Sequence, residues 1–257
     1  MTHTKLNIHN ITEALVLRDI VEPDIVFYDV TDSTNQRARE WAREGRGEAI
    51  FIARSQSAGR GRLGRSFLSD EGGIYLSMLV YPEKRLNTPA KITAEAAVRL
   101  SHAVERLTGV SPEIKWVNDL YKNGKKIAGI LTEGEFDESG NLRYYILGLG
   151  INVYKIDDFS TKMPVATTLE ELTNLEININ DLCAEIIVEL RRPSSPLELL
   201  SEYRERCIVP GREVTVIRGN DEYSARAVSI TDDYGLMVIR PNGQREVLSS
   251  GEISLRL

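Results

Sequence analysis

The stretch at 115–134, KWVNDLYKNGKKIAGILTEG, decides the fold. Asn123-Gly124 stands between two apolar-rich runs, which is a strong signal for a β-hairpin with a two-residue turn. Side chains alternate along a strand, so Asp119 and Lys126 would share one face as diagonal neighbours roughly 7–8 Å apart at Cα. They either flank a ligand or form a surface ion pair. The turn predicts three cross-strand pairs: Lys122 with Lys125, Tyr121 with Lys126, and Asp119 with Ala128.

Outward from this hairpin, strand-like and helix-like segments alternate. Hairpins outnumber β-α-β units, which favours an α+β fold with a mixed or antiparallel sheet packed with helices. Apolar spacing predicts helices at 89–109, 36–44 (capped by Ser33 or Thr34), 181–191 and 196–206, with another at 6–16. Strands are predicted at 48–55, 73–80, 113–122, 125–134 and 144–153, and a further strand begins at 25–28.

The last fifty residues differ in character from the rest of the chain. Five short strand candidates follow one another, with turn residues at Gly219-Asn220, Asp232-Asp233 and Asn242-Gly243. This pattern predicts a small β-barrel. We therefore divide the chain into a larger domain at 1–207, with its core from about residue 28, and a β-barrel at 208–257.

Composition excludes several classes of protein. The 257 residues are 42% hydrophobic and 27% charged, with a net charge of −6, which argues against a general nucleic-acid coat or a polybasic membrane binder. The sequence has no apolar run of spanning length and no signal peptide pattern. Two cysteines form neither a disulfide scaffold nor a four-ligand zinc site. We expect a reduced, cytoplasmic protein.

The densest group of chemically active residues is GRGRLGR at 59–65, with three glycines and three arginines. It matches the dinucleotide pattern G-x-G-x-x-G, but turn-like residues follow it where that fingerprint needs a helix. Guanidinium groups suit carboxylate and phosphate oxygens, and glycines let the backbone approach a ligand closely. The run therefore predicts an anion-binding loop; the alternative is a solvated loop whose arginines pair with surface acids.

Two further motifs point to a ligand. Gly148 and Gly150 within a strand mark a β-bulge or the close approach of another group, and Asn152 beside them needs a polar partner. DSTN at 32–35 caps a helix, and a helix N-terminus can also hold a polar ligand.

These blocks occur in one order that resembles the biotin protein ligases. The resemblance covers about 28–257 and implies a catalytic domain like that of class II aminoacyl-tRNA synthetases and biotin/lipoate ligases, followed by an SH3-like barrel. Val117 stands where many members have proline, and Phe67 where some have tryptophan. The blocks are DSTN at 32–35, QSAGRGRLGR at 56–65, KWVNDL at 115–120, KIAGILTE at 126–133, LGLGINV at 147–153 and GEISLR at 251–256.

The resemblance also implies an activity. Biotin is activated with ATP and Mg²⁺ to biotinyl-5′-AMP, and is then transferred to a lysine of a biotin carboxyl carrier domain of a carboxylase. The Mg²⁺ arrives with ATP, and its protein ligands are not identified. The arginine loop should be mobile when empty and close over the ligand, keeping water from the mixed anhydride.

Residue roles follow from the same resemblance. Lys126, Arg60 and Arg62 would stabilise charge at the carboxylate and the α-phosphate; Phe67 would stack on adenine; Asp119 would orient Lys126 or deprotonate the incoming lysine. The implied catalytic residues are Lys126, Arg60, Arg62 and Asp119. Implied biotin-binding residues are Ser33, Thr34, Asn35, Gln56, Gly59, Arg60, Gly61, Arg62, Lys126 and Gly129. Implied ATP-binding residues are Arg60, Arg62, Arg65, Phe67, Asn118, Lys126 and Asn152.

Many bacterial members of this family add an N-terminal DNA-binding domain. Here the DSTN block begins at residue 32, so we expect a ligase without DNA binding. We also expect no membrane attachment; family members occur as monomers and homodimers, and both states stay open for this protein. Alternatives are a lipoate ligase, a biotin-sensing protein without catalysis, and an octanoyl transferase with a cysteine nucleophile. Cys183 and Cys207 both stand among apolar residues and are interpreted as packing residues.

Overall fold

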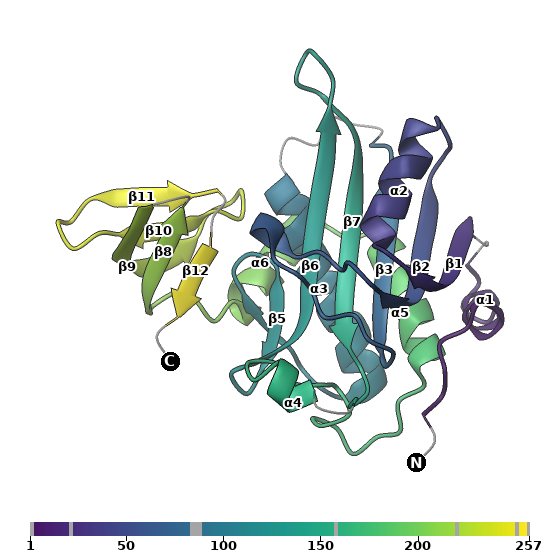
Figure 1. Cartoon of the computed structure of the whole chain (residues 1–257). Helices are drawn as coiled ribbons and strands as arrows, with labels where there is room; N and C mark the ends of the chain where they lie inside the picture. Colours follow the sequence, from purple (N-terminus) through teal and green to yellow (C-terminus); the bar gives the residue numbers. More distant parts are fainter. Residues whose placement is uncertain are drawn as a thin grey trace.

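The computed structural model describes residues 3–20, 23–82, 89–156, 159–218, 221–249 and 252–255. They form a seven-stranded sheet in the order β1-β2-β3-β7-β6-β5-β4 and a five-stranded sheet in the order β11-β10-β9-β8-β12 (Figure 1). In the larger sheet β1 and β2 are parallel, whereas the other neighbours are antiparallel. The predicted α+β class with a mixed sheet is confirmed.

The elements match most of the predicted segments. The larger sheet consists of β1 Ile25–Thr31, β2 Ala49–Gln56, β3 Gly73–Val80, β4 Glu113–Lys115, β5 Asp119–Lys122, β6 Lys125–Phe136 and β7 Leu142–Asn152. The helices are α1 Ile8–Val16, α2 Thr34–Arg43, α3 Pro89–Thr108, α4 Phe159–Lys162, α5 Ile179–Arg191 and α6 Pro196–Arg206, with a 3-10 turn η1 at Arg62–Gly64. The four-residue helix α4 was not predicted.

Both faces of the larger sheet are covered, because its strands are apolar on both sides. In β2, Phe51 packs with Ala38 of α2 on one face, while Ile50 and Ile52 belong to the main core on the other. Helix α2 lies against β2, β3 and β7, whereas α3 packs on β6 and carries α5 and α6 behind it (Figure 1). Helix α1 packs on α5.

The central hairpin forms as predicted at its turn. Asn123 and Gly124 have φ of 51° and 75°, as this turn type requires, and Tyr121 pairs with Lys126. Further along, the predicted register is wrong: Asp119 lies opposite Gly129, because the pairing shifts by one residue between Leu120 and Tyr121. Such a β-bulge inserts one extra residue into one strand of the pair, here β6, and bends that strand locally.

The segment 113–122 was predicted to be one strand, and this is wrong. The chain reverses at 116–118, so β4 and β5 pair antiparallel, with Lys115 opposite Asp119. Trp116 and Val117 are 3% and 4% exposed. Burying these two apolar side chains stabilises the reversal, which holds Asn118 in the turn just before β5.

The five predicted strands near the C-terminus are confirmed as an antiparallel sheet. The predicted turn at Gly219-Asn220 lies outside the described residues. The predicted boundary between the two domains, at residues 207 and 208, stays a proposal. The strands are β8 Glu213–Arg218, β9 Asp221–Ile230, β10 Leu236–Ile239, β11 Arg245–Leu248 and β12 Glu252–Leu255.

This sheet docks on the larger unit through the turn between β9 and β10. The indole Nε1 of Trp116 donates to the carbonyl of Tyr234 at 2.8 Å, and the ring of Tyr203 meets the Tyr234 ring edge-on at 5.3 Å between centroids. Arg204 of α6 donates to the carbonyl of Ile230 at 3.1 Å. The second sheet is thereby fixed to the turn that carries Asn118.

Candidate active site

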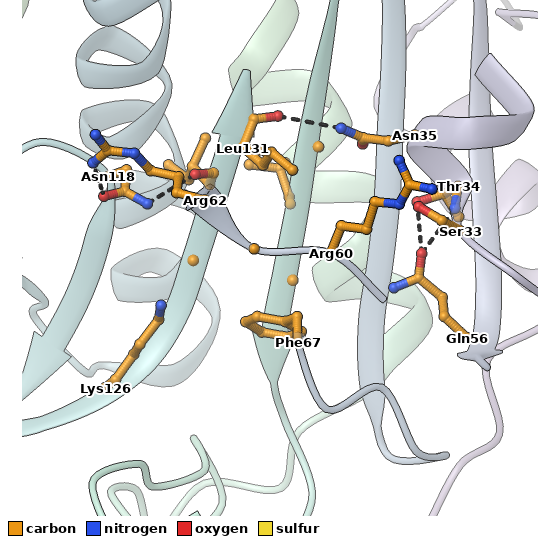
Figure 2. Close-up of a pocket in the computed structure, with 16 residues that line it drawn as sticks. Ser33, Thr34, Asn35, Gln56, Arg60, Arg62, Phe67, Asn118, Lys126 and Leu131 are labelled. Atoms are coloured by element: carbon orange, nitrogen blue, oxygen red, sulfur yellow. Dashed lines mark hydrogen bonds between the residues drawn. The ribbon is translucent and has the colours of Figure 1, made fainter. Parts of the chain in front are cut away.

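A narrow cavity of about 60 Å³ lies beside the first turn of α2, between β6, β7 and the loop after β2 (Figure 2). Its lining joins the DSTN block, the Gly-Arg run, the KWVNDL turn and the glycines of β6 and β7. Segments far apart in the sequence therefore converge on one place. Its lining is Ser33, Thr34, Asn35, Gln56, Arg60, Gly61, Arg62, Phe67, Asn118, Lys126, Gly129, Ile130, Leu131, Gly148, Leu149 and Gly150.

Glycines form the floor of this cavity. Gly129 and Gly150 pair across β6 and β7. A Cβ on Gly150 would lie 2.5 Å from the ring of Phe67, and one on Gly148 would lie 2.1 Å from Oδ1 of Asn35. Only glycine leaves room here for both side chains, so the sequence expectation of a close approach at Gly148 and Gly150 is confirmed.

The end of the cavity beside α2 is lined by polar side chains. Oε1 of Gln56 accepts hydrogen bonds from the backbone N–H of Thr34 at 2.8 Å and from its hydroxyl at 3.1 Å. Ser33 occupies the N-cap position, but its side chain makes no capping bond. The Ser33 hydroxyl, which makes no capping bond, lines the cavity and can face a ligand.

The Gly-Arg run forms a closed loop over the cavity. The N–H of Phe67 donates to the carbonyl of Gly59 at 2.9 Å, and the N–H of Gly61 donates to the carbonyl of Arg65 at 2.7 Å. Within the loop, Arg60 is exposed. Nη1 of Arg62 donates to Oδ1 of Asn118 at 2.9 Å (Figure 2). The loop is thus tied at its base and along its length; Arg60 and Arg62 line the narrow cavity, and Arg65 lines a neighbouring, wider cavity.

Lys126 stands where this cavity meets a second, wider one of about 450 Å³. Its Nζ lies 2.7 Å from Oδ1 of Asp119, and the two side chains are 24% and 19% exposed. The backbone of Lys126 is held by the segment after α4: its N–H donates to the carbonyl of Val165, and its carbonyl accepts from the N–H of Thr167. The ammonium therefore has a fixed place at the junction.

The larger domain matches the model of the Biotin/lipoate A/B protein ligase family over residues 27–152. The C-terminal sheet matches the Biotin protein ligase C terminal domain over residues 210–256. A bifunctional ligase/repressor BirA of Bacillus spizizenii is 30% identical over 244 residues, covering 90% of this chain and 74% of that protein. The chain belongs to the biotin protein ligase family.

Two further comparisons agree with this membership. The biotin–[acetyl-CoA-carboxylase] ligase of Paracoccus denitrificans is 27% identical over 234 residues, covering 87% of this chain and 97% of that protein. A solved biotin protein ligase from Aquifex aeolicus, in complex with biotin and ATP, has a TM-score of 0.76 at 27% identity, covering 91% of this chain and 98% of that one. The protein is a ligase enzyme.

The structure brings nearly all the residues implied by the family resemblance to these two cavities. Most line the narrow cavity, and the wider one adds Arg65, Asp119 and Asn152. Gly59 lines neither cavity. A Cβ at Gly59 would lie 2.4 Å from both the Phe67 carbonyl oxygen and Oγ of Ser69, so this glycine serves loop closure instead.

Several lining residues were missed from the sequence. Leu131 and Leu149 of the narrow cavity belong to ordinary apolar strands, and Ile253 of the wider cavity comes from the C-terminal sheet. Met163 and Val165 follow α4. Nothing in the local sequence distinguishes these residues, because only the folded arrangement places them beside the ligase site.

The two cysteines are buried, as expected for packing residues. Burial raises the pKa of the Cys183 thiol to about 12 and that of Cys207 to about 11. Both thiols are therefore neutral near pH 7, unlike a nucleophilic thiolate. Neither lines the two cavities.

Within the described ranges, no three His, Cys, Asp or Glu side chains come together in a way that could hold a metal ion. The lining of the wider cavity includes the carboxylate of Asp119 and the amides of Asn118 and Asn152. Among the described helices, none has the length and apolarity needed to cross a membrane.

Proposed function

We propose that this ligase joins biotin and MgATP to form biotinyl-5′-AMP, and then transfers biotin to a lysine of a biotin carboxyl carrier domain. The observation that carries this proposal is the junction of the two cavities. Gly61, Arg62, Phe67, Asn118 and Lys126 line both. A carboxylate in the narrow cavity and a triphosphate in the wider one would meet at Arg62 and Lys126.

The narrow cavity suits biotin. Its far end offers Thr34, Gln56 and Ser33, which are neutral donors and acceptors for an uncharged ureido ring. Leu131 and Leu149 supply apolar contact on its walls. Figure 2 shows the Arg60 guanidinium beside Thr34, whereas Arg62 donates to Asn118. The valeryl carboxylate of a bound biotin would lie at Arg62, where the two cavities meet.

In the first step a biotin carboxylate oxygen attacks the α-phosphorus. An O–P bond forms, the bond from this phosphorus to the bridging oxygen breaks, and pyrophosphate leaves. Negative charge builds on the α-phosphoryl oxygens, and fixed guanidinium and ammonium groups stabilise it without reorganisation. Asp119 keeps the Lys126 ammonium in place through the 2.7 Å ion pair.

In the second step the amine of the carrier lysine attacks the acyl carbon. An N–C bond forms, the C–O bond to phosphate breaks, and AMP leaves. The amine must lose a proton, and Asp119 lines the wider cavity beside this point. We therefore assign it a second role as the proton acceptor for the attacking amine.

The nucleotide would occupy the wider cavity. The Phe67 ring, which lies 5.7 Å from the Lys126 Nζ, offers a face for adenine. Asn118 and Asn152 supply amide oxygens near the phosphates. We write the magnesium ion as part of the MgATP substrate, with Asn118 and Asn152 as the side chains that would contact it or the phosphates.

One assay tests the reaction and the rival substrates together. The protein is incubated with MgATP and biotin, lipoate or octanoate, and pyrophosphate release is measured. We expect pyrophosphate release with biotin but not with lipoate or octanoate. Equal pyrophosphate release with lipoate would favour a lipoate ligase. Biotin binding without pyrophosphate release would favour a sensing protein. Intact mass of an added carrier domain should then increase by one biotinyl group, unless its acceptor lysine is replaced by arginine.

We also propose that the protein does not act as a DNA-binding repressor. Residues 3–20 hold one helix, α1, whose Ile11 and Leu15 are buried. A gel-shift experiment with biotin and ATP present should show no sequence-specific complex, and a specific complex would refute this part. Homodimer formation and a cytoplasmic location remain predictions.

A further inference from the structure

Ser69 follows the arginine loop and is 3% exposed. Its hydroxyl accepts a hydrogen bond from Nε2 of Gln56 at 2.9 Å and donates to the carbonyl of Phe67 at 2.9 Å. It does not line the narrow or the wider cavity. The hydroxyl nevertheless connects a residue of the polar cavity end directly to the backbone of the loop.

These bonds belong to a larger hydrogen-bond network that reaches the first turn of α2 and the buried strand β3. In the buried strand β3, the hydroxyl of Ser77 donates to Oδ1 of Asn35 at 2.6 Å, and as an acceptor it lies 2.7 Å from the hydroxyl of Thr34. The backbone N–H of Thr34 donates to Oε1 of Gln56 at 2.8 Å, the Gln56 Nε2 donates to Ser69, and Ser69 donates to the Phe67 carbonyl. From Gln56 onward the roles are matched, because the Ser69 hydroxyl accepts from the Gln56 amide and donates to the Phe67 carbonyl.

The network ends at the base of the arginine loop. There the N–H of Phe67 donates to the carbonyl of Gly59, and the N–H of Gln56 donates to the carbonyl of Ser69 at 2.9 Å. A Cβ on Gly59 would lie 2.4 Å from Oγ of Ser69, so the strand and the loop are packed together at this point. The position of Phe67, and hence of its ring over the glycine floor, depends on the same bonds.

We propose that Ser69 is a positioning residue that couples occupation of the polar cavity end to the order of the arginine loop. The inference rests on the proposed function, because biotin is the ligand expected to bond with Thr34 and Gln56. A ligand that orders the Gln56 carboxamide strengthens its bond to Ser69, which in turn holds the Phe67 carbonyl. Ligand binding thereby restrains residues 59–67 without touching Ser69.

Hydrogen exchange measures this coupling directly. In the wild-type protein, saturating biotin should slow exchange of the amides at 59–67 about fivefold or more. In Ser69→Ala, saturating biotin should slow it less than about twofold, because the link is cut. Ser57→Ala is the matched control: this exposed hydroxyl makes only a 3.4 Å contact with the Thr31 carbonyl, and wild-type protection is expected. Full protection in Ser69→Ala would overturn the inference.

The kcat/KM for biotin of single and double variants gives a second test, because a simple loss of stability would not produce the pattern expected here. Ser69→Ala should lower kcat/KM for biotin about tenfold, and Gln56→Ala should lower it as well. Because Ser69 acts through Gln56, the double variant should be within about twofold of Gln56→Ala alone. Losses that multiply would contradict the coupling.

A nearly isosteric variant keeps the test valid if Ser69→Ala does not fold. Ser69→Cys preserves the packing but has only a weak donor and acceptor, so it should also lose loop protection. Wild-type protection in Ser69→Cys would contradict the inference. Failure of the proposed function has a different signature: the wild-type protein itself would release no pyrophosphate with biotin and MgATP.

Discussion

Lys126 and Asp119 form an ion pair of 2.7 Å across the β5–β6 hairpin, at the junction of the narrow and the wider cavity. The pair faces the Phe67 ring on one side. A lysine fixed by a carboxylate at this point differs from a surface hairpin lysine, because both side chains are largely withdrawn from solvent. The ion pair is the feature on which the proposed chemistry depends most.

Replacing Lys126 should abolish or severely reduce the first step. We expect Lys126→Ala to lower the rate of biotin-dependent pyrophosphate release about a hundredfold or more, because a preorganised charge at the α-phosphate is lost. The neighbouring Lys125 is exposed and provides a matched control. Lys125→Ala should retain wild-type turnover. Near-normal turnover of Lys126→Ala would refute the role assigned to its ammonium.

The glycine floor should not tolerate a methyl group. In Gly148→Ala the new Cβ would lie 2.1 Å from Oδ1 of Asn35, so that side chain must move into the cavity. We expect biotin affinity, measured by titration calorimetry, to fall about tenfold or more, with a loss of stability of about 1–3 kcal/mol. Gly47→Ala, where a Cβ meets nothing within 4 Å, should change neither. Unchanged affinity in Gly148→Ala would contradict this account of the cavity.

The two tryptophans allow a matched test of the contact between the sheets. Trp116 donates a buried hydrogen bond to the carbonyl of Tyr234. Trp41 donates an exposed hydrogen bond to the carbonyl of Gly47. Trp116→Phe leaves a buried carbonyl without its donor and should lower the free energy of unfolding by about 1–3 kcal/mol in urea titrations. Trp41→Phe should cost clearly less. Equal losses would mean that the buried bond does not secure the second sheet.

The pKa of Asp32, which precedes α2, predicts that the stability of the protein depends on pH. Burial would raise the pKa of its carboxyl, but hydrogen bonds from Arg37, the Ser33 N–H and Thr31 outweigh burial and hold the pKa below its usual value. A lowered folded-state pKa means that the carboxylate contributes stability above the unfolded-state pKa near 4. That contribution is lost as the pH falls through the folded-state value.

Comparing the wild-type protein with Asp32→Asn measures this contribution. The variant should be less stable by at most about 1 kcal/mol at neutral pH, since the partners are partly exposed to solvent. The difference should disappear in acid, below about pH 3. If the difference in stability persisted unchanged in acid, it would come from packing and not from the charge of Asp32.

Local chemistry explains why much of this site could be predicted. A two-residue turn at Asn123-Gly124 needs positive φ at both positions and therefore reveals its hairpin in the sequence. A run of glycines and arginines likewise predicts anion binding from its composition, because guanidinium groups bind anions and glycines let the backbone approach them. The arginine loop could be named before the structure for this reason, whereas the role of Lys126 was implied by the family resemblance.

The remaining features depend on tertiary packing. The reversal at 116–118 depends on burial of Trp116 beneath Tyr234, which is more than a hundred residues away in the chain. The β-bulge that sets Asp119 opposite Gly129 has no turn signal of its own. Ile253 reaches the wider cavity only because the second sheet docks where it does. Local patterns cannot specify such long-range contacts.

The most direct test of the central claim is to identify the product that the protein retains. The protein is incubated with biotin and MgATP in the absence of a carrier, separated from free ligands, denatured, and its bound small molecules are analysed by mass spectrometry. The two-cavity junction predicts biotinyl-5′-AMP in the wild-type protein and little or none in Lys126→Ala. Recovery of unreacted biotin and ATP from the wild-type protein would contradict the claim that this junction forms the adenylate.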